Sequence, residues 1–283
     1  MRPSPRRQPL AELLVFARQV RGELRKQVHP LVGLTSLCVG IATCALQAAH
    51  VSDPYPGPSI RDVAGELRIA FLQHSTTLGF VYAGVLAAVG TADEAGRGAL
   101  ADVLLREPRR RRVTLMKSAA VYLGLLGSVV LTFVGLAVTH GVLAAQGVTA
   151  PPMSRSSLSD MAIDVGCSLP VLALAATTSA AIALATRSIL ATIVLTITVF
   201  YLPLTVLQDE IFWATPTRWI VEWLHLDPFG EGVDYLADNS PYDHRGVPAF
   251  VGGCLIVMLV VVLAGAMPAI ISRSVQRANQ RHV

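Results

Sequence analysis

The sequence predicts an all-α membrane protein with six transmembrane helices and an N-terminal amphipathic helix at the membrane interface. Of its 283 residues, 53% are hydrophobic and 15% are charged, and the mean hydropathy is +0.54. Soluble domains carry about 25% charged residues, so this deficit indicates a polytopic membrane protein. Two further observations support this class. Apolar runs long enough to cross a bilayer recur along the chain, and the basic residues gather in alternate connecting segments.

Residues 1–30 form the first predicted element. Pro30 then turns the chain into the first apolar run, which begins too late for a cleavable signal peptide. An apolar stripe at helical spacing predicts a helix that lies in the inner membrane interface, and a soluble cytoplasmic helix is the alternative. The stripe consists of Leu10, Leu13, Leu14, Ala17, Val20, Leu24 and Val28.

Residues 31–283 form a six-span transmembrane domain in this interpretation. A helix of 20 residues covers the ~30 Å hydrocarbon core. Helices are expected because every backbone N–H group in lipid needs a partner within its own segment. The predicted spans are 31–49, 69–90, 114–146, 161–186, 188–207 and 249–272.

The distribution of basic residues predicts the orientation. The chain has 23 Lys and Arg residues, and 18 of them fall in the termini and the loops on one side, against five on the other. The positive-inside rule then places both termini in the cytoplasm. The basic pI therefore marks a cytoplasmic membrane face and does not indicate nucleic-acid binding. The strong preference for Arg over Lys suggests a GC-rich bacterial genome, so we expect a bacterial cytoplasmic membrane.

The predicted extracellular segment 208–248 contains all three tryptophans and eight carboxylates. Tryptophan favours the headgroup level, so we expect short helices that dip into, or lie along, the outer leaflet, with Ile220, Trp223 and Leu224 on one face. Spread carboxylates are usually solvated, and the sequence does not establish a cation or ligand site there. The four cysteines lie within or beside apolar runs without a CxxC motif, so we expect no metal site.

The segment from Gly90 to Ser118, between the second and third spans, has the densest positive charge. A helix is predicted from Glu94 to Glu107, with Leu100, Val103 and Leu104 on one side, and Pro108 should end it. An apolar stripe that faces the cytosol favours a protein groove. The alternative is a loop whose arginines, Arg109 to Arg112, bind anionic membrane lipid. Lys117 is expected to extend its ammonium back toward water.

This segment resembles the signature of ABC-2 type transporter permeases. Their pattern is Glu, then Gly-Thr-Leu, a leucine pair, Pro, a basic residue and a Lys that opens the third span. Ala99 replaces the usual Thr. The six-span layout, the interfacial helix and the long last outer segment resemble the family as well. The matching residues are Glu94, Gly98, Leu100, Leu104, Leu105, Pro108, Arg110 and Lys117.

The resemblance implies that residues 91–108 are a coupling helix that docks on a separate ATPase subunit. Glu94 would pair with a basic residue of the ATPase or of the interfacial helix. Two ATPase copies carrying ATP and Mg, and a second permease copy or a related permease, are the implied partners. The implied coupling residues are Glu94, Arg97, Gly98, Leu100, Asp102, Val103 and Leu104, with Pro108, Arg110 and Lys117 completing the motif.

The chain itself is not expected to be an enzyme or to hold a cofactor. A P-loop requires Gly-Lys, and neither Lys26 nor Lys117 follows a glycine. Polar residues in the spans are candidates for a translocation path, because such residues are costly in lipid. Threonine often bonds its own helix instead, and His74 facing water is another alternative. The candidates are Gln47, Gln73, His74, Thr76, Thr77, Thr192, Thr196 and Tyr201.

The expected function is that of a permease subunit in an ATP-driven exporter. The mostly apolar spans favour a drug, antibiotic, peptide or lipid-like amphipathic substrate over a sugar polymer. A membrane-embedded enzyme is one alternative, although the spans hold almost no ionisable residues beyond His74 and His140. A non-transporting scaffold or sensor is the other. The sequence does not identify the substrate, the direction of transport, or a homodimer over a heterodimer.

Overall fold

The computed structural model describes residues 8–27, 30–50, 63–76, 78–145, 155–205, 219–220, 223–224 and 249–280. These residues form helices and short turns, and none of them lies in a strand. The elements in chain order are α1 (Gln8–Gln27), α2 (Pro30–His50), α3 (Val63–Thr76), α4 (Leu78–Ala87), the π-helix η1 (Ala88–Ala92), α5 (Asp93–Gly96), α6 (Ala99–Arg106), α7 (Arg110–Ala145), α8 (Arg155–Thr186), α9 (Ile189–Thr205) and α13 (Ala249–Gln280).

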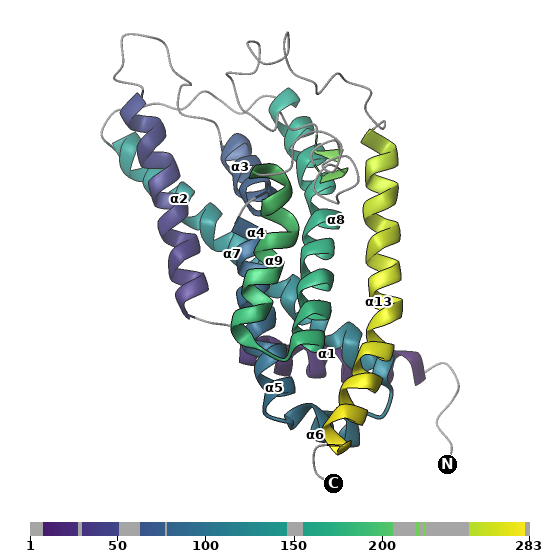
Figure 1. Cartoon of the computed structure of the whole chain (residues 1–283). Helices are drawn as coiled ribbons and strands as arrows, with labels where there is room; N and C mark the ends of the chain where they lie inside the picture. The colour runs from purple at the N-terminus through teal and green to yellow at the C-terminus, as the bar shows by residue number, and fades with distance from the viewer. Residues whose placement is uncertain are drawn as a thin grey trace.

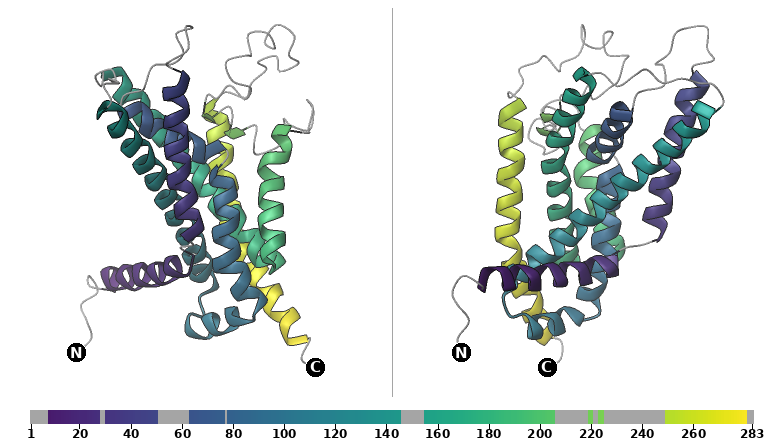
Figure 2. Two further views of the ribbon diagram at one scale, coloured as in Figure 1. Left: turned by 90° about the vertical axis from the view of Figure 1, so that its left-hand side faces the viewer. Right: turned by 180° about the vertical axis from the view of Figure 1, so that it is seen from behind.

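The long helices run side by side, and α1 lies across one end of them (Figure 1). Figure 2 shows the same crossing from two other directions. Helices α5 and α6 and the C-terminal part of α13 lie at the end where α1 crosses, which we call the basic end. An amphipathic helix across the ends of apolar helices has the geometry expected at a membrane interface.

Four helical segments are long and apolar enough to cross a membrane: Leu78–Gly96, Arg110–Ala145, Met161–Thr186 and Val251–Ser272. A fifth is obtained if Glu12–Gln27 and Pro30–Ala45, which are bent by 77°, count as one broken span. Helix α9 contributes a shorter apolar stretch, Ile189–Phe200. The described residues are thus all-helical with four or five candidate membrane-spanning helices, and the count of six spans stays a prediction.

Several helices differ in extent from the predicted spans. The second predicted span, 69–90, comprises α3, α4 and η1, with residue 77 outside the described residues. Helix α7 begins at Arg110 instead of residue 114, and α8 begins at Arg155 instead of residue 161. Helical hydrogen bonding continues beyond the hydrocarbon layer, whereas hydropathy marks only the apolar part of each helix.

Helices α2 and α7 cross closely because glycines face one another. A Cβ atom added at Gly40 would lie 2.1 Å from the Thr132 carbonyl oxygen, and one at Gly135 would lie 2.4 Å from that of Leu37. Thr132 also donates a hydrogen bond of 3.0 Å to the carbonyl oxygen of Ser36. Small residues allow such backbone contact between helices in lipid.

The centre of the bundle is formed by α4, α8 and α9. The Phe80 and Phe200 rings stack with centroids 4.2 Å apart. Beside them, a Cβ at Gly84 would meet Thr196 Cβ at 3.3 Å, so α9 packs directly on α4. These contacts bury much of α4, and its Phe80 is 1% exposed.

The described residues of the predicted outer segment pack on other helices. Their expected placement at the outer leaflet stays a prediction. Ile220 and Leu224 are buried, and the Trp223 indole donates a hydrogen bond of 2.8 Å to the Cys167 carbonyl oxygen. A Cβ at Gly253 of α13 would collide with the Trp223 ring. A hydrogen-bonding partner on α8 and glycines on α13 therefore hold this turn, and the other residues of 208–248 lie outside the described residues.

Candidate coupling site at the basic end

The segment predicted as one helix from Glu94 to Glu107 is two helices, α5 and α6, with a break between them. Gly98 has φ 81°, a left-handed conformation that glycine adopts without a Cβ penalty. This residue interrupts the helix between α5 and α6, which corrects the expectation of a continuous helix. Glu107 is extended, with φ −130° and ψ 90°, as the following Pro108 requires.

A cluster of four charged side chains, which we call the lysine–glutamate ring, joins α5 to α1 and α7. Its members are Glu23, Lys26, Glu94 and Lys117. Lys117 Nζ donates hydrogen bonds to Glu23 Oε2, to Glu94 Oε2 and, at 3.0 Å, to the Gly90 carbonyl oxygen. Lys26 Nζ bridges the other carboxylate oxygens, 2.8 Å from Glu23 Oε1 and 2.7 Å from Glu94 Oε1. Each carboxylate is therefore shared by two ammonium groups.

The ring lies mostly within the protein. The Lys117 side chain is 0% exposed, against 6% for Glu23, 15% for Glu94 and 49% for Lys26. The two positive and two negative charges of the ring neutralise one another, so no unpaired charge is removed from water. Buried ion pairs are tolerated under this condition. The burial of Lys117 corrects the expectation that its ammonium extends to water. The Lys117 side chain extends from α7 toward Glu23 of α1 and Glu94 of α5.

The ring explains why lysine occurs here in a chain that otherwise uses arginine. Both lysines of the sequence, Lys26 and Lys117, belong to the ring. An ammonium is compact and donates three hydrogen bonds in three directions. Lys117 uses all three donors on three acceptors, whereas a planar guanidinium would not fit that arrangement.

The electrostatics of Lys26 follow from its position at the edge of the ring. Burial lowers the pKa of its ammonium, but hydrogen bonds and charges from Glu23 and Glu94 act in the opposite direction. Their sum raises the pKa above the ordinary 10.5. The surroundings of Lys26 therefore favour its charged form over its neutral form.

The π-helix η1 brings its backbone to the ring. Gly90 lies in this wider turn, and its carbonyl oxygen accepts the Lys117 hydrogen bond. A Cβ at Gly90 would lie 2.1 Å from Gln27 Cγ, so only glycine leaves room for the end of α1. The Gln27 amide is fully buried and has no hydrogen-bond partner among the described residues. Such π-bulges occur frequently at functional sites.

The apolar stripe of the segment faces the protein and not the cytosol, which corrects the expected docking face. Leu100 is 4% exposed and packs in a cluster with Val20, Met116, Leu184 and Met267, from α1, α7, α8 and α13. Val103 and Leu104 lie against the same cluster. Four neighbouring helices, α1, α7, α8 and α13, therefore form the groove that this stripe fills.

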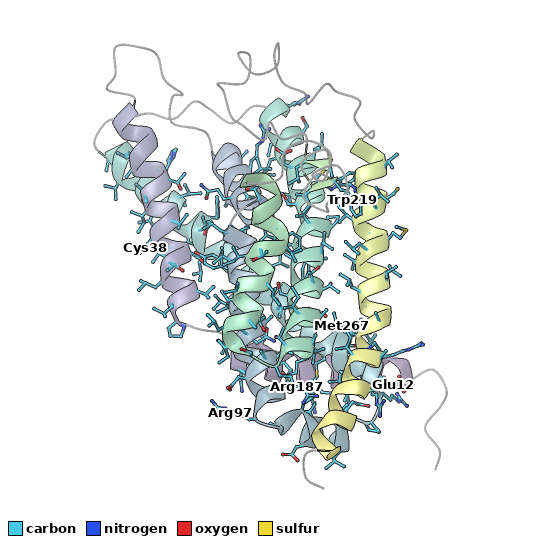
Figure 3. All side chains as sticks on the ribbon, in the orientation of Figure 1. Glu12, Cys38, Arg97, Arg187, Trp219 and Met267 are labelled. Carbon is cyan, nitrogen blue, oxygen red and sulfur yellow. The ribbon has the colours of Figure 1, made fainter. Side chains whose placement is uncertain are left out.

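The outward surface of the segment carries different residues. Leu105 is 83% exposed, and Arg97, Gly98, Ala101 and Asp102 are also exposed. We call these five residues the coupling tip. Arg97 pairs with Asp93 at 2.9 Å along the helix. Figure 3 shows Arg97 at the basic end together with Glu12 and Arg187, far from Trp219 at the opposite end.

The turn between α8 and α9 also contacts residues 91–108, which we call the coupling segment. Arg187 has φ 54°, and its carbonyl oxygen lies 2.9 Å from where a Cβ of Gly96 would stand. Glycine at 96 thus allows α5 to approach the turn. The coupling segment consequently contacts four parts of the chain, namely α1, α7, the α8–α9 turn and the end of α13.

Two remaining motif residues lie where α6 meets α7. Pro108 lies in the short connection between the helices and is exposed. Arg110 opens α7 and donates a hydrogen bond to Ser272 Oγ of α13. The ten implied coupling residues therefore fall into three groups: ring members, buried apolar residues and the exposed tip with its connection.

The candidate path residues are mostly involved in helix packing. Gln73 donates a hydrogen bond of 3.1 Å to Thr43 Oγ1 and so links α3 to α2. His74 is 0% exposed and its Nδ1 lies 2.8 Å from the Ala70 carbonyl oxygen, so it does not face water. Thr76 bonds the Leu72 carbonyl oxygen of its own helix.

The two threonines of α9 are buried at the contact with α4 and α8. Thr192 bonds the Ser188 carbonyl oxygen at 2.8 Å and lies 3.1 Å from Thr186 Oγ1. Thr196 is fully buried and packs on Gly84. Packing of α9 on α4 and α8 brings these positions together, and their role in a translocation path stays a prediction. Thr77 and the side chains of Gln47 and Tyr201 lie outside the described residues.

The expected pairing of Glu94 with a basic residue of the interfacial helix is confirmed, because Lys26 Nζ of α1 lies 2.7 Å from Glu94 Oε1. Sequence reasoning missed Glu23, Gln27 and Gly90 as members of this site. The rarity of lysine was a usable signal, since both lysines meet in one cluster. Spacing along the chain gave no comparable signal, because Glu23 and Lys117 are 94 residues apart. Their meeting depends on how α1 crosses α7.

The chain matches no protein-family model, no curated protein and no solved structure. The resemblance to ABC-2 permeases therefore depends on the residues between Glu94 and Lys117 and on the helical layout.

Proposed function

We propose that this chain is the permease subunit of an ATP-driven ABC-2 type exporter in a bacterial cytoplasmic membrane. The observation that carries the proposal is the coupling tip, an exposed surface tied to two long helices through the lysine–glutamate ring. In the proposed complex a separate ATPase subunit, present in two copies, binds ATP and Mg and contacts this tip. The termini and the basic end face the cytoplasm.

The contacts of the ring support transmission of motion from the tip. Glu94 lies in α5, next to the tip, and shares its two oxygens between Lys26 of α1 and Lys117 of α7. A displacement of α5 must therefore either move both helices or break desolvated ion pairs, which is costly. Packed elements that shift as units are the usual means of coupling distant sites.

The rest of the proposal concerns assembly and cargo. A second copy of the chain, or a related permease, completes the path, because six spans are half the usual complement of this transporter class. The substrate is a drug, antibiotic, peptide or lipid-like amphipathic molecule, consistent with the apolar helices. Neither a membrane-embedded enzyme nor a scaffold is favoured by a specific contact in the described residues.

Replacing Leu105 tests the proposal directly. The full chain is purified from its native membranes in mild detergent, and Mg-dependent ATP hydrolysis that co-elutes with it is measured. Leu105→Glu places a charge at an exposed apolar contact, and we expect about tenfold less co-eluting activity, which corresponds to about 1.4 kcal/mol of binding. Arg21→Gln, an exposed change of one charge on α1, should leave the activity unchanged.

Two results would contradict the proposal. The first is equal ATPase activity in the Leu105→Glu and wild-type preparations. The second is labelling from outside: a single cysteine at Asp102, in a chain without the four native cysteines, should react with a membrane-impermeant maleimide only after cells are opened. Reaction in intact cells would place the tip on the wrong side.

A further inference from the structure

We propose that a pocket at the basic end binds one anionic phospholipid from the leaflet in which α1 lies. The pocket has a volume of about 930 Å³ and is bounded by α1, by the connection into α7, and by α13. This volume is at the upper end of typical small-molecule sites, at 300–1,000 Å³. The proposal requires only a membrane protein and does not depend on the transport function.

The charged side of the pocket is the run Arg109 to Arg112. Arg112 is already held by Glu107 at 3.5 Å, by the Glu12 carbonyl oxygen at 3.3 Å and by the Phe16 ring at 6.0 Å. Arg110 is held by Ser272. Arg109 and Arg111 are exposed and have no ion pair or hydrogen bond from their side chains among the described residues. Two guanidinium groups are thus available to an external ligand.

The other side of the pocket is apolar. Leu13, Phe16, Leu115 and Pro268 line it, and Leu13 and Leu115 are 65% and 51% exposed. Leu115 and Pro268 belong to segments that are apolar enough to cross the membrane. The pocket therefore extends from an interfacial charge cluster to the hydrocarbon layer, as a phosphodiester headgroup with acyl chains requires.

The sign of the charge selects an anionic lipid over a zwitterionic one. Among the described residues, the pocket is lined by four arginines, Arg109 to Arg112, and one carboxylate, Glu12. Glu107 pairs with Arg112 and offsets one further positive charge. The positive end of the α7 dipole adds to this potential, because α7 begins at Arg110. Guanidinium groups bind phosphate with two parallel hydrogen bonds, which suits a phosphodiester.

The position of the pocket favours lipid over a soluble partner. Part of its apolar lining, Leu115 and Pro268, lies on helices apolar enough to cross a membrane, whereas α6 projects beyond α1 at the basic end (Figure 1). A soluble protein that contacts the coupling tip would approach from that projecting side. A lipid headgroup reaches the arginines laterally, from the level at which α1 lies.

Lipid titration of the purified full chain tests the proposal. The chain is held in neutral detergent, and bound lipid is counted by native mass spectrometry with phosphatidylglycerol or phosphatidylcholine. We expect one tightly bound phosphatidylglycerol. Arg109→Gln with Arg111→Gln should weaken its binding about thirtyfold, from the contribution of each basic residue to anionic-lipid attraction. Arg21→Gln with Arg25→Gln removes the same charge from an exposed part of α1 and should change binding less than about threefold, because charges outside the site are screened.

The apolar side is tested with Leu13→Gln. This variant should weaken binding of phosphatidylglycerol but leave binding of glycerol phosphate, which has no acyl chains, unaltered. Three outcomes would overturn the proposal. They are equal binding of both lipids, an equal loss of phosphatidylglycerol binding in the two double arginine variants, or competition by inorganic phosphate that is as strong as competition by lipid. The first two indicate unspecific attraction, and the third indicates a site for a free anion.

Discussion

Removal of the Lys117 ammonium should destabilise the protein more than any exposed charge change at the same end. In Lys117→Met, an apolar side chain of similar length takes the place of an ammonium that is 0% exposed and contacts two carboxylates. Loss of one partner of a buried pair costs about 3–5 kcal/mol. Lys26 still faces both carboxylates, so we expect the lower end, about 3 kcal/mol.

The assay is thermal unfolding of the purified chain in detergent. A loss of 1 kcal/mol lowers Tm by about 2–4 °C in a chain of this size class, so Lys117→Met should lower Tm by about 6–12 °C. Arg97→Met is the matched control, because its pair with Asp93 is exposed and lies on the same side of the bundle. Exposed pairs contribute at most about 1 kcal/mol. A Tm for Lys117→Met equal to that of Arg97→Met would refute the structural role of the ring.

A second variant separates charge from packing. Combining Lys117→Met with Glu94→Gln removes one charge of each sign and leaves Glu23 paired with Lys26 at 2.8 Å. The double variant should therefore lose less stability than the two single variants together, with a coupling of about 0.5–3 kcal/mol. Strict additivity would show that the four side chains act independently.

Two predictions concern glycines. Gly98→Ala forces a Cβ into a left-handed conformation at φ 81° and should cost about 1–2 kcal/mol of stability, although no atom lies within 4 Å of that Cβ. Gly40→Ala should cost about 1–3 kcal/mol, because its Cβ meets the Thr132 backbone at 2.1 Å and separates α2 from α7. Gly127→Ala, with open space at its Cβ, is the control for both and should leave Tm equal or slightly higher. Equal Tm values for the three variants would contradict both predictions.

Hydropathy predicted the all-helical class and the limits of some of the helices. The predicted limits of the fifth span, 188–207, agree closely with α9, Ile189–Thr205, because Arg187 and Ser188 interrupt two apolar runs. The first span, 31–49, likewise coincides with α2, Pro30–His50. Apolar length is a property of the local sequence, so it predicts these elements without knowledge of their neighbours.

Contacts between distant segments were not predictable in this way. Lys117 was expected to reach water because lysine near a helix end usually does so. The structure instead supplies Glu23, Glu94 and the Gly90 carbonyl oxygen around it, and all three come from other elements. The burial of His74 has the same origin, since its surroundings are set by the packing of α3 and not by its own sequence.

The apolar stripe of α6 shows how an amphipathic pattern can mislead about function. Leu100, Val103 and Leu104 predict that one face of the helix packs on an apolar surface. The pattern does not distinguish a surface of the same chain from a surface of a partner protein. The break at Gly98 turns α6 beneath the bundle, and α1, α7, α8 and α13 then provide that surface within the same chain. The face left for a partner is the opposite one, where Leu105 is 83% exposed. A charged substitution at Leu100 would therefore damage the fold before it affected a partner, and only substitutions such as Leu105→Glu distinguish docking from folding.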